Sequence, residues 1–179
     1  PHITDEIKRD MLYLGKTKKY DFVITEIGGT VGDIEGQPFL EAIRQLKWDL
    51  GKNAVCIHLT YVPYLAAAGE LKTKPTQHSV KELQSLGIQP DILVLRAEHE
   101  LGTGLRRKIA AFCNVSPEAV VQSLDQPTIY EVPLRMQEQG LDATILRKLD
   151  MPVGETPGLG PWRSFLDRRH KATEIINIG

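Results

Sequence analysis

A short apolar run that meets an acidic, glycine-rich turn constrains the fold of this chain more than any other feature. Residues 22–25 read Phe-Val-Ile-Thr, the aromatic and β-branched composition of a strand buried on both faces. Glu26 follows directly, and residues 28–32 then hold three glycines. Because ligands of parallel sheets bind beyond the carboxyl ends of the strands, this run predicts a strand whose end carries a binding turn.

Asp33 and Glu35 add two carboxylates just after the turn. Carboxylates at the end of a strand favour a magnesium-bound nucleotide, or a ligand rich in hydroxyl and amine donors. The alternative is a glycine loop whose acids only face solvent or cap the next helix. Spacing alone leaves both interpretations open.

The rest of the chain alternates between strand-like and helix-like apolar runs. Strands are predicted at 54–60, 91–96 and 120–123. Helices are predicted at 3–12 with Thr4 as the N-cap, 38–50 ended by Gly51, 76–86 with Thr76 as the N-cap, 104–113, 133–139 and 141–149. Alternation at this spacing predicts a parallel α/β sheet with helices on both faces.

The composition changes near the carboxyl end. Residues 152–161 hold three prolines and three glycines, which predicts a linker. Trp162, Phe165 and Leu166 then share one side of a predicted helix that also carries arginines, a pattern typical of packing against a neighbouring domain. Residues 175–179 read as the start of another strand. Since Pro1 is not a natural start residue, we expect the chain to be a piece of a longer protein.

Bulk properties exclude several classes of protein. A formal net charge of −1 argues against a nucleic-acid binder. No apolar run reaches the length of a membrane span, and no signal peptide is visible, so no membrane partner is expected. Cys56 and Cys113 are the two cysteines and look like small core residues, which favours a reduced, cytoplasmic setting.

A second polar segment lies at residues 72–77, Lys-Thr-Lys-Pro-Thr-Gln, at the start of a predicted helix. Helix N-terminal amides favour anions, and two ammonium groups beside them would suit a triphosphate. Lys108, on the helix after the next strand, could add a third cation. The alternative is a lysine-rich surface loop.

Three other candidate site features give weaker support for a function. Gly15-Lys16-Thr17 mimics the end of a phosphate-binding loop, but position 10 is Asp where the pattern needs glycine, so we reject it. His58, within a predicted strand, is interpreted as a hydrogen-bonded core histidine and not a metal ligand. His78 is left as a residue that could line a pocket.

Four segments of the chain form specific motifs. They are Glu-Ile-Gly-Gly-Thr-Val-Gly-Asp-Ile-Glu (26–35), Pro-Phe-Leu-Glu-Ala-Ile-Arg-Gln (38–45), the 58–64 stretch with His-Leu-Thr and Val-Pro-Tyr, and residues 69–83 with Lys-Thr-Lys-Pro-Thr-Gln-His-Ser. Together these segments closely resemble CTP synthase. Residues 87–91 and 112–115 also match. The resemblance runs from residue 1 to about 150.

The resemblance implies a three-layer α/β/α fold with a parallel sheet, P-loop NTPase-like and dethiobiotin-synthetase-like, here incomplete at the N-terminus. It implies a ligase of pyrimidine biosynthesis that phosphorylates the 4-oxygen of UTP with Mg-ATP. Ammonia, supplied from glutamine by a separate glutamine amidotransferase domain, then displaces the phosphate to give CTP. The family works as a homotetramer.

Carried over by motif, the resemblance also implies roles for single residues. The UTP/CTP site would comprise Asp33, Ile34, Glu35, Lys72, Thr73, Lys74, Pro75, Thr76, Gln77 and Lys108. Leu124, Asp125 and Gln126 fall near the turn that contacts ATP, and Glu26 resembles a magnesium ligand. No catalytic residue is assigned.

The same resemblance divides the chain into a synthetase fragment at 1–150 and an interdomain linker at 151–179. The phosphate-binding loop is expected before Pro1 and the amidotransferase after Gly179, so the chain alone is expected to be inactive. One rival hypothesis is a non-catalytic module that binds CTP or UTP for regulation. Another is an assembly element built on the helix at 39–50.

Overall fold

The structure is a computed structural model that describes residues 1–155 and 158–174. Three strands form a parallel sheet in the order β1-β4-β5. They are β1 (Ile57–Tyr61), β4 (Ile92–Ala97) and β5 (Val120–Leu124). Ile57 pairs with Ile92, and Leu93 with Val120, so the carboxyl ends of all three strands lie at one edge. The strands predicted at 54–60, 91–96 and 120–123 are confirmed.

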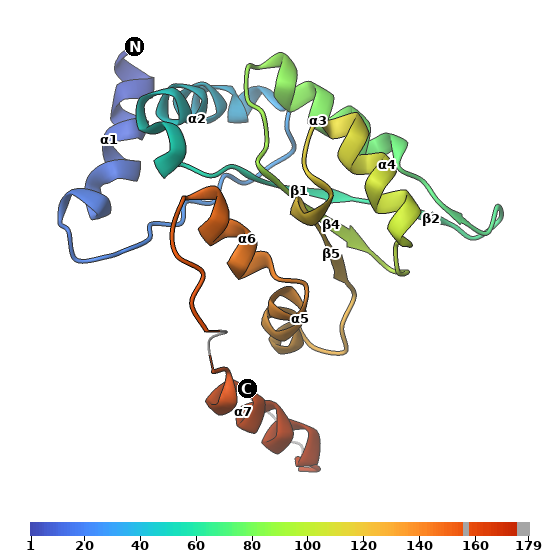
Figure 1. Cartoon of the computed structure of the whole chain (residues 1–179). Helices are drawn as coiled ribbons and strands as arrows, with labels where there is room; N and C mark the ends of the chain where they lie inside the picture. The colour runs from blue at the N-terminus through green and yellow to red at the C-terminus, as the bar shows by residue number, and fades with distance from the viewer. Residues whose placement is uncertain (156–157, 175–179) are drawn as a thin grey trace.

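Helices cover both faces of this sheet (Figure 1). α3 (Lys74–Ser85) joins β1 to β4, and α4 (Thr103–Cys113) joins β4 to β5, both on one face. Because the two crossovers step in the same direction across the sheet, right-handed connections place both helices on the same side. α5 (Val132–Glu138) and α6 (Leu141–Lys148) lie on the other face. The predicted α/β class with three layers is confirmed.

The main core lies between β4 and the helices α3 and α4. Leu93 and Leu95 of β4 are fully buried, together with Val80 of α3 and Ile109 of α4. Burying side chains of this size stabilises the fold by roughly 1.5–3 kcal/mol each. The core therefore holds α3 and α4 firmly against the sheet.

A smaller apolar cluster joins the amino-terminal part of the chain to this body. α1 (His2–Lys16) packs on α2 (Gln37–Leu50), and Leu40 of α2 packs with Leu83 and Ile88. Gly51 ends α2 with φ +54, a conformation that favours glycine, so the predicted helix end is confirmed.

One side chain closes the free edge of β5. Gln139 accepts a hydrogen bond from the backbone N–H of Gln122 (2.9 Å) and donates one to its carbonyl (2.6 Å). The amide of Gln139 thus takes the place of a neighbouring strand. This contact ties the end of α5 to the sheet.

The predicted strand at 22–25 is wrong. Residues 22–28 have no regular secondary structure, the side chain of Ile24 is 94% exposed, and β1 is paired with β4 alone. β-branched composition favours extended backbone, but a strand also needs a hydrogen-bonded neighbour. In the described residues this segment has none.

Two predicted N-caps are also wrong. α1 begins at His2, so Thr4 lies within its first turn and donates its hydroxyl to the carbonyl of Pro1 (2.9 Å). α3 begins at Lys74, since Pro75 suits the first turn of a helix, and this places Thr76 inside the helix. A cap must have a non-helical backbone, which neither threonine has here.

The remaining elements are short, apart from the last helix. They are η1 (Ile34–Gly36), η2 (Gly51–Asn53), the hairpin β2 (Tyr64–Leu65) and β3 (Glu70–Leu71), η3 (Pro117–Ala119), η4 (Ile129–Glu131) and α7 (Gly160–Lys171). α7 confirms the helix predicted around Trp162. The strand predicted at 175–179 lies outside the described residues. Among the helices that are described, none is long and apolar enough to cross a bilayer.

Candidate functional site

The three carboxylates of the amino-terminal loop surround one cavity of about 400 Å³. Its lining residues are Glu26, Ile27, Gly28, Gly29, Asp33, Glu35, Gly36 and Phe39. The structure thus brings Glu26, Asp33 and Glu35 to one cavity. The expectation that they lie at the end of a sheet strand is wrong, because the segment before them is not a strand and the cavity opens beside the start of α2.

Local hydrogen bonds give the loop its shape. The carboxylate of Asp33 accepts from the N–H of Thr30 (3.1 Å), and the N–H of Asp33 donates to the Thr30 carbonyl (3.0 Å). Gly29 and Gly32 have φ of +86 and +104, which side chains other than glycine rarely adopt. Ile34, at the start of η1, is 78% exposed. The loop is therefore a turn fixed by its own backbone.

The segment 72–77 is fixed differently, by the sheet. Thr76 is fully buried, where its hydroxyl bonds that of Thr60 (3.0 Å) and donates to the carbonyl of Tyr61 (3.2 Å), both in β1. Thr73 is also buried and accepts from the side chain of Gln77 (3.1 Å). The two threonine hydroxyls are thus engaged within the protein.

The lysines of this segment, unlike its threonines, are not buried against the sheet. Lys74 is exposed at the first residue of α3, beside Pro75, which is also exposed. Lys72 pairs with Glu70 and lowers the pKa of that carboxyl, and Lys108 on α4 lowers it further. Both predicted cations therefore stabilise the charged form of this carboxylate, Lys72 by direct contact and Lys108 only at longer range.

The carboxyl edge of the sheet carries further polar groups. Asp125, just after β5, pairs with Arg96 of β4 (3.5 Å), and Tyr61 of β1 donates its hydroxyl to Glu98 (3.3 Å). Burial, together with the charges of Glu98 and Asp125, raises the pKa of Tyr61. All three strand ends thus contribute to one polar rim.

The turn at 124–126 is part of this rim. The side chain of Gln126 donates to the carbonyls of Leu124 (3.0 Å) and Asp125 (3.1 Å), and accepts from Arg135 of α5 (3.3 Å). Because Thr76 is bonded to Tyr61, the segment 72–77 and the turn lie at the same edge of the sheet.

The acidic cavity is displaced from this rim along α3. A Cβ at Gly32 would lie 3.5 Å from Cγ of Glu82. Glu82 follows Lys74 by eight residues, which is about 12 Å along a helix axis. Within residues 1–155 and 158–174, no hydrogen bond or ion pair joins residues 26–35 to 72–77. The two predicted parts of the nucleotide site lie toward opposite ends of one helix.

No group of three or more metal-binding side chains is present in the described part of the chain. Magnesium usually keeps several waters and takes one or two carboxylates together with substrate phosphates. Glu26 is exposed and beside two other acids, which suits a nucleotide-borne magnesium and not a site made of protein ligands alone. Its assignment as a magnesium ligand stays a prediction.

Other titratable groups have structural roles. His58 is buried and bonds the hydroxyl of Ser79 (2.9 Å), so its interpretation as a core histidine is confirmed. Burial lowers the pKa of His58 and raises that of Cys56 and Cys113 to about 11, so neither thiol is an activated nucleophile. His78 is exposed on α3.

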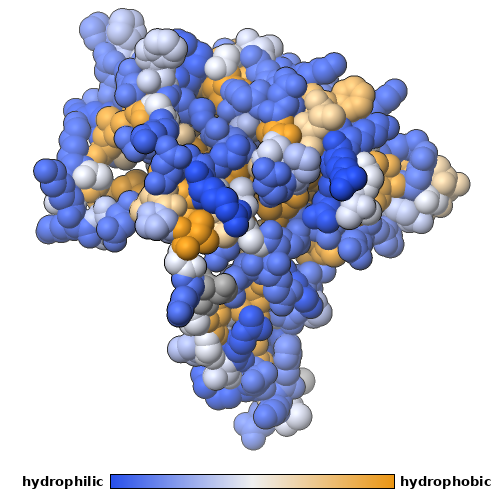
Figure 2. Space-filling view, in the orientation of Figure 1, coloured by the Kyte–Doolittle hydropathy of each residue, from blue (hydrophilic) through white to orange (hydrophobic). Residues whose placement is uncertain are grey.

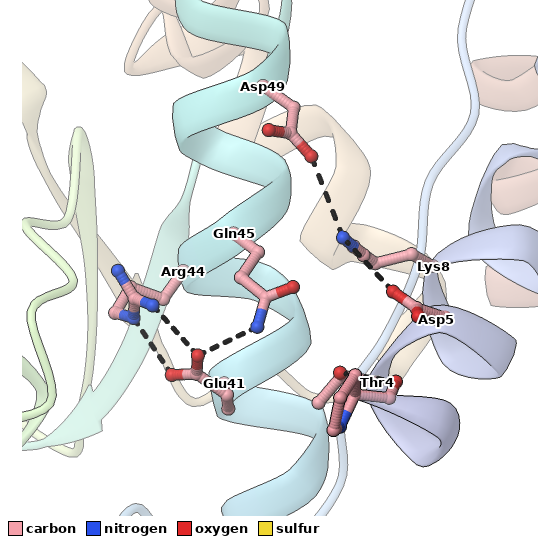
Figure 3. Close-up of polar contacts among 8 residues, drawn as sticks. Thr4, Asp5, Lys8, Glu41, Arg44, Gln45 and Asp49 are labelled. Carbon is pink, nitrogen blue, oxygen red and sulfur yellow. Dashed lines mark hydrogen bonds and ion pairs between the residues drawn. The ribbon is translucent and has the colours of Figure 1, made fainter.

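A second hollow, of about 370 Å³, lies between α1 and α2 and is lined by Lys8, Arg44 and Trp48 among others. Lys8 lies between Asp5 (3.6 Å) and Asp49 (3.7 Å) (Figure 3). Arg44 makes two hydrogen bonds of 2.8 Å to Glu41 and thereby lowers the pKa of Glu41 to about 2. Since both cations already face carboxylates, the hollow has little attraction for an anion.

Sequence reasoning missed several residues of the rim and of the cavity. Tyr61, Arg96 and Glu98 at the rim were not singled out as site residues, and neither was Phe39, which lines the acidic cavity. Position relative to a strand end was the available signal for the rim residues. No comparable signal pointed to Phe39.

Comparison with known proteins supports a single family. The family described as "CTP synthase N-terminus" matches residues 1–151. CTP synthase of Bacteroides thetaiotaomicron is 76% identical over 99% of this chain and 34% of its own length. The Porphyromonas gingivalis enzyme is 65% identical over 99% of the chain and 33% of its own length, and that of Flavobacterium johnsoniae is 61% identical over 100% and 34%.

The chain spans about a third of the length of these curated relatives. The match covers the sheet and all the candidate site residues. With that match, the chain belongs to the CTP synthase N-terminus family.

Proposed function

We propose that residues 1–150 form the central and carboxyl-terminal part of the synthetase domain of a cytoplasmic CTP synthase. In that enzyme ATP-dependent amination converts UTP to CTP through a 4-phosphorylated intermediate. Residues 151–179 would be the linker to a glutamine amidotransferase domain. The observation that carries the proposal is that the 72–77 segment and the 124–126 turn lie at one edge of a parallel sheet.

The lysines would bind the triphosphate of UTP or CTP. Lys74 stands at the first turn of α3, where the helix dipole adds to its charge. Lys72 would exchange Glu70 for phosphate oxygens, and Lys108 on α4 would add positive charge at longer range. Thr73 and Thr76 are bonded within the protein, so their part is to hold the lysines in place.

The acidic cavity would bind the other end of the nucleotide. The carboxylates of Asp33 and Glu35 accept hydrogen bonds from ribose hydroxyls or from the exocyclic amine of CTP. Ile34, exposed between them, would contact the base. A homotetramer is part of the proposal, since a partner could complete a site that one chain divides between two ends of α3.

ATP and magnesium complete the proposal. The turn of Leu124, Asp125 and Gln126 would contact ATP, and Glu26 would hold the magnesium together with phosphate oxygens. When bound, magnesium neutralises charge that develops on the transferred phosphoryl group. The chain's own residues would orient the two nucleotides. We expect the 179-residue chain alone to make no CTP from UTP, ATP and ammonia.

Calorimetric titration of CTP and UTP tests the lysine assignment. The Lys72→Ala, Lys74→Ala double variant should lose at least about tenfold in affinity, since a charge-assisted hydrogen bond contributes roughly 1.5–3 kcal/mol. Lys81→Ala, which removes an exposed lysine from the same helix, is the matched control and should bind as the parent does. Equal loss in both variants would mean that only general charge matters.

A further inference from the structure

The last described helix is attached to the loop that continues the 124–126 turn. Trp162 of α7 donates its indole N–H to the carbonyl of Tyr130 (2.7 Å). The rings of Trp162 and Phe165 lie 6.1 and 5.3 Å from that of Tyr130, the latter edge-on. His170, two turns further along α7, contacts Glu131 (3.1 Å). α7 therefore contacts both Tyr130 and Glu131, through residues two turns apart.

These contacts explain why α7 holds its position although it does not pack on the sheet. α7 projects away from the sheet and its helices (Figure 1), yet Leu166 in its middle is only 4% exposed. Figure 2 shows a mainly hydrophilic projection with apolar atoms along it. Aromatic pairs of this kind contribute about 0.5–1.5 kcal/mol each beyond the area they bury. Without Tyr130, α7 would lose its three-ring cluster.

The loop that α7 contacts, residues 127–131, directly follows the 124–126 turn of the rim. Thr128 is buried, and its hydroxyl and carbonyl accept from the N–H groups of Tyr130 (3.5 Å) and Glu131 (3.1 Å). Two residues earlier, the side chain of Gln126 fixes the carbonyls of the 124–126 turn. A shift of Tyr130 must therefore move Thr128 and, through Pro127, the turn itself.

We propose that α7 positions the ATP-contacting turn, with Trp162 and Tyr130 as its positioning residues. The inference rests on the proposed function in that the turn is taken to contact ATP. Docking of α7 stabilises the binding-competent turn, and release of α7 weakens ATP binding while leaving the pyrimidine nucleotide unaffected. By linkage, ATP bound at the turn must in return stabilise the docked helix. Any element that engages α7 would thus control the affinity for ATP.

Amide hydrogen exchange on the whole chain tests the coupling without a nucleotide. In Trp162→Leu, the amides of Asp125, Tyr130 and Glu131 should exchange at least about fivefold faster, the lower end of typical coupling between sites. Arg163→Ala removes the neighbouring exposed side chain of α7 and should change none of them. Trp162→Phe keeps a ring and should restore part of the protection. Faster exchange in α7 alone, with the three amides unchanged, overturns the inference.

A second arm uses Mg-ATP. Trp48 is the other of the two tryptophans, so in a Trp48→Phe chain the emission of Trp162 reports on α7 alone. Mg-ATP should change this emission and UTP should not, and Trp162→Leu should bind ATP at least about fivefold more weakly with unchanged affinity for UTP. ATP that binds with equal affinity to parent and variant overturns the inference. If the parent binds no ATP by calorimetry, the proposed role of the turn fails, and the exchange measurement still decides the coupling.

Discussion

The acidic loop and the lysine segment are both short polar stretches, but the protein holds them in place by different means. The lysine segment is attached to β1 through Thr76, whose side chain is fully buried. The acidic loop is shaped by hydrogen bonds within itself, chiefly between Thr30 and Asp33. The loop packs on the rest of the molecule through Val31, which contacts the cluster of Leu40, Leu83 and Ile88, and through Gly32, which lies close to Glu82.

The difference shows how a binding segment gains its accuracy. A segment bonded to a central sheet inherits the rigidity of the core, and its geometry is set by register. A loop that folds on itself can keep its internal shape while its position depends on a few apolar contacts. We therefore expect changes in the lysine segment to affect global stability, and changes in the loop to affect mainly the cavity.

The largest effect is expected for Thr76→Val. Valine has a similar shape, but it leaves the hydroxyl of Thr60 and the carbonyl of Tyr61 without this partner in a buried place. The free energy of unfolding should fall by about 1–3 kcal/mol, measured by urea denaturation. The loop counterpart Thr30→Val changes an exposed side chain and should stay within about 0.5 kcal/mol. Equal losses in the two variants would remove the distinction between the segments.

A smaller effect is expected for Gly32→Ala. With φ at +104, alanine is strained whatever the space around it. This backbone strain should destabilise the native conformation of the loop by about 1–2 kcal/mol. Gly154→Ala is the control, because Gly154 does not line the cavity, a Cβ there meets nothing within 4 Å and its φ is not in the left-handed region. Affinity for CTP should fall in the first variant alone, as measured by calorimetry. Unchanged affinity would separate the loop from the nucleotide site.

The same contrast explains what could be predicted from the sequence. Strands β1, β4 and β5 and helices α2, α4 and α7 were predictable, because apolar periodicity reports directly on burial against a sheet or a helix. The run at 22–25 has strand composition as well, and there composition failed. A ladder depends on a neighbour, and the sequence of one segment does not say which neighbour it has.

The site could be predicted only in part for a related reason. Motifs pointed to the lysines and to the acids, but the 12 Å or so that separates them along α3 is a property of the assembled helices. The bond from Thr76 to β1 was missed because the threonine was interpreted as a cap. Tyr61 is distant in sequence from Arg96 and Glu98, and it meets them only because β1 and β4 are in register.

The smallest effect in this comparison concerns pH and His58. Burial lowers the pKa of His58 from its ordinary 6.5, so the folded chain resists protonation where the unfolded chain accepts it. The unfolded state then binds more protons, and stability rises with pH. The contribution is fully present above about pH 6.5 and is lost as the pH falls toward the folded-state pKa.

His58 links β1 to α3 through Ser79, so acid should loosen the anchoring of the lysine segment before it affects the loop. Urea denaturation of the parent should give a lower free energy of unfolding at about pH 5.5 than at about pH 7.5, on either side of the ordinary histidine pKa. His58→Gln should reduce this difference. His78→Gln, one position before Ser79 and exposed, should leave it as in the parent. If the His58 variant keeps the full difference, the pH dependence arises elsewhere and the sheet-anchored segment is no more sensitive to acid than the loop.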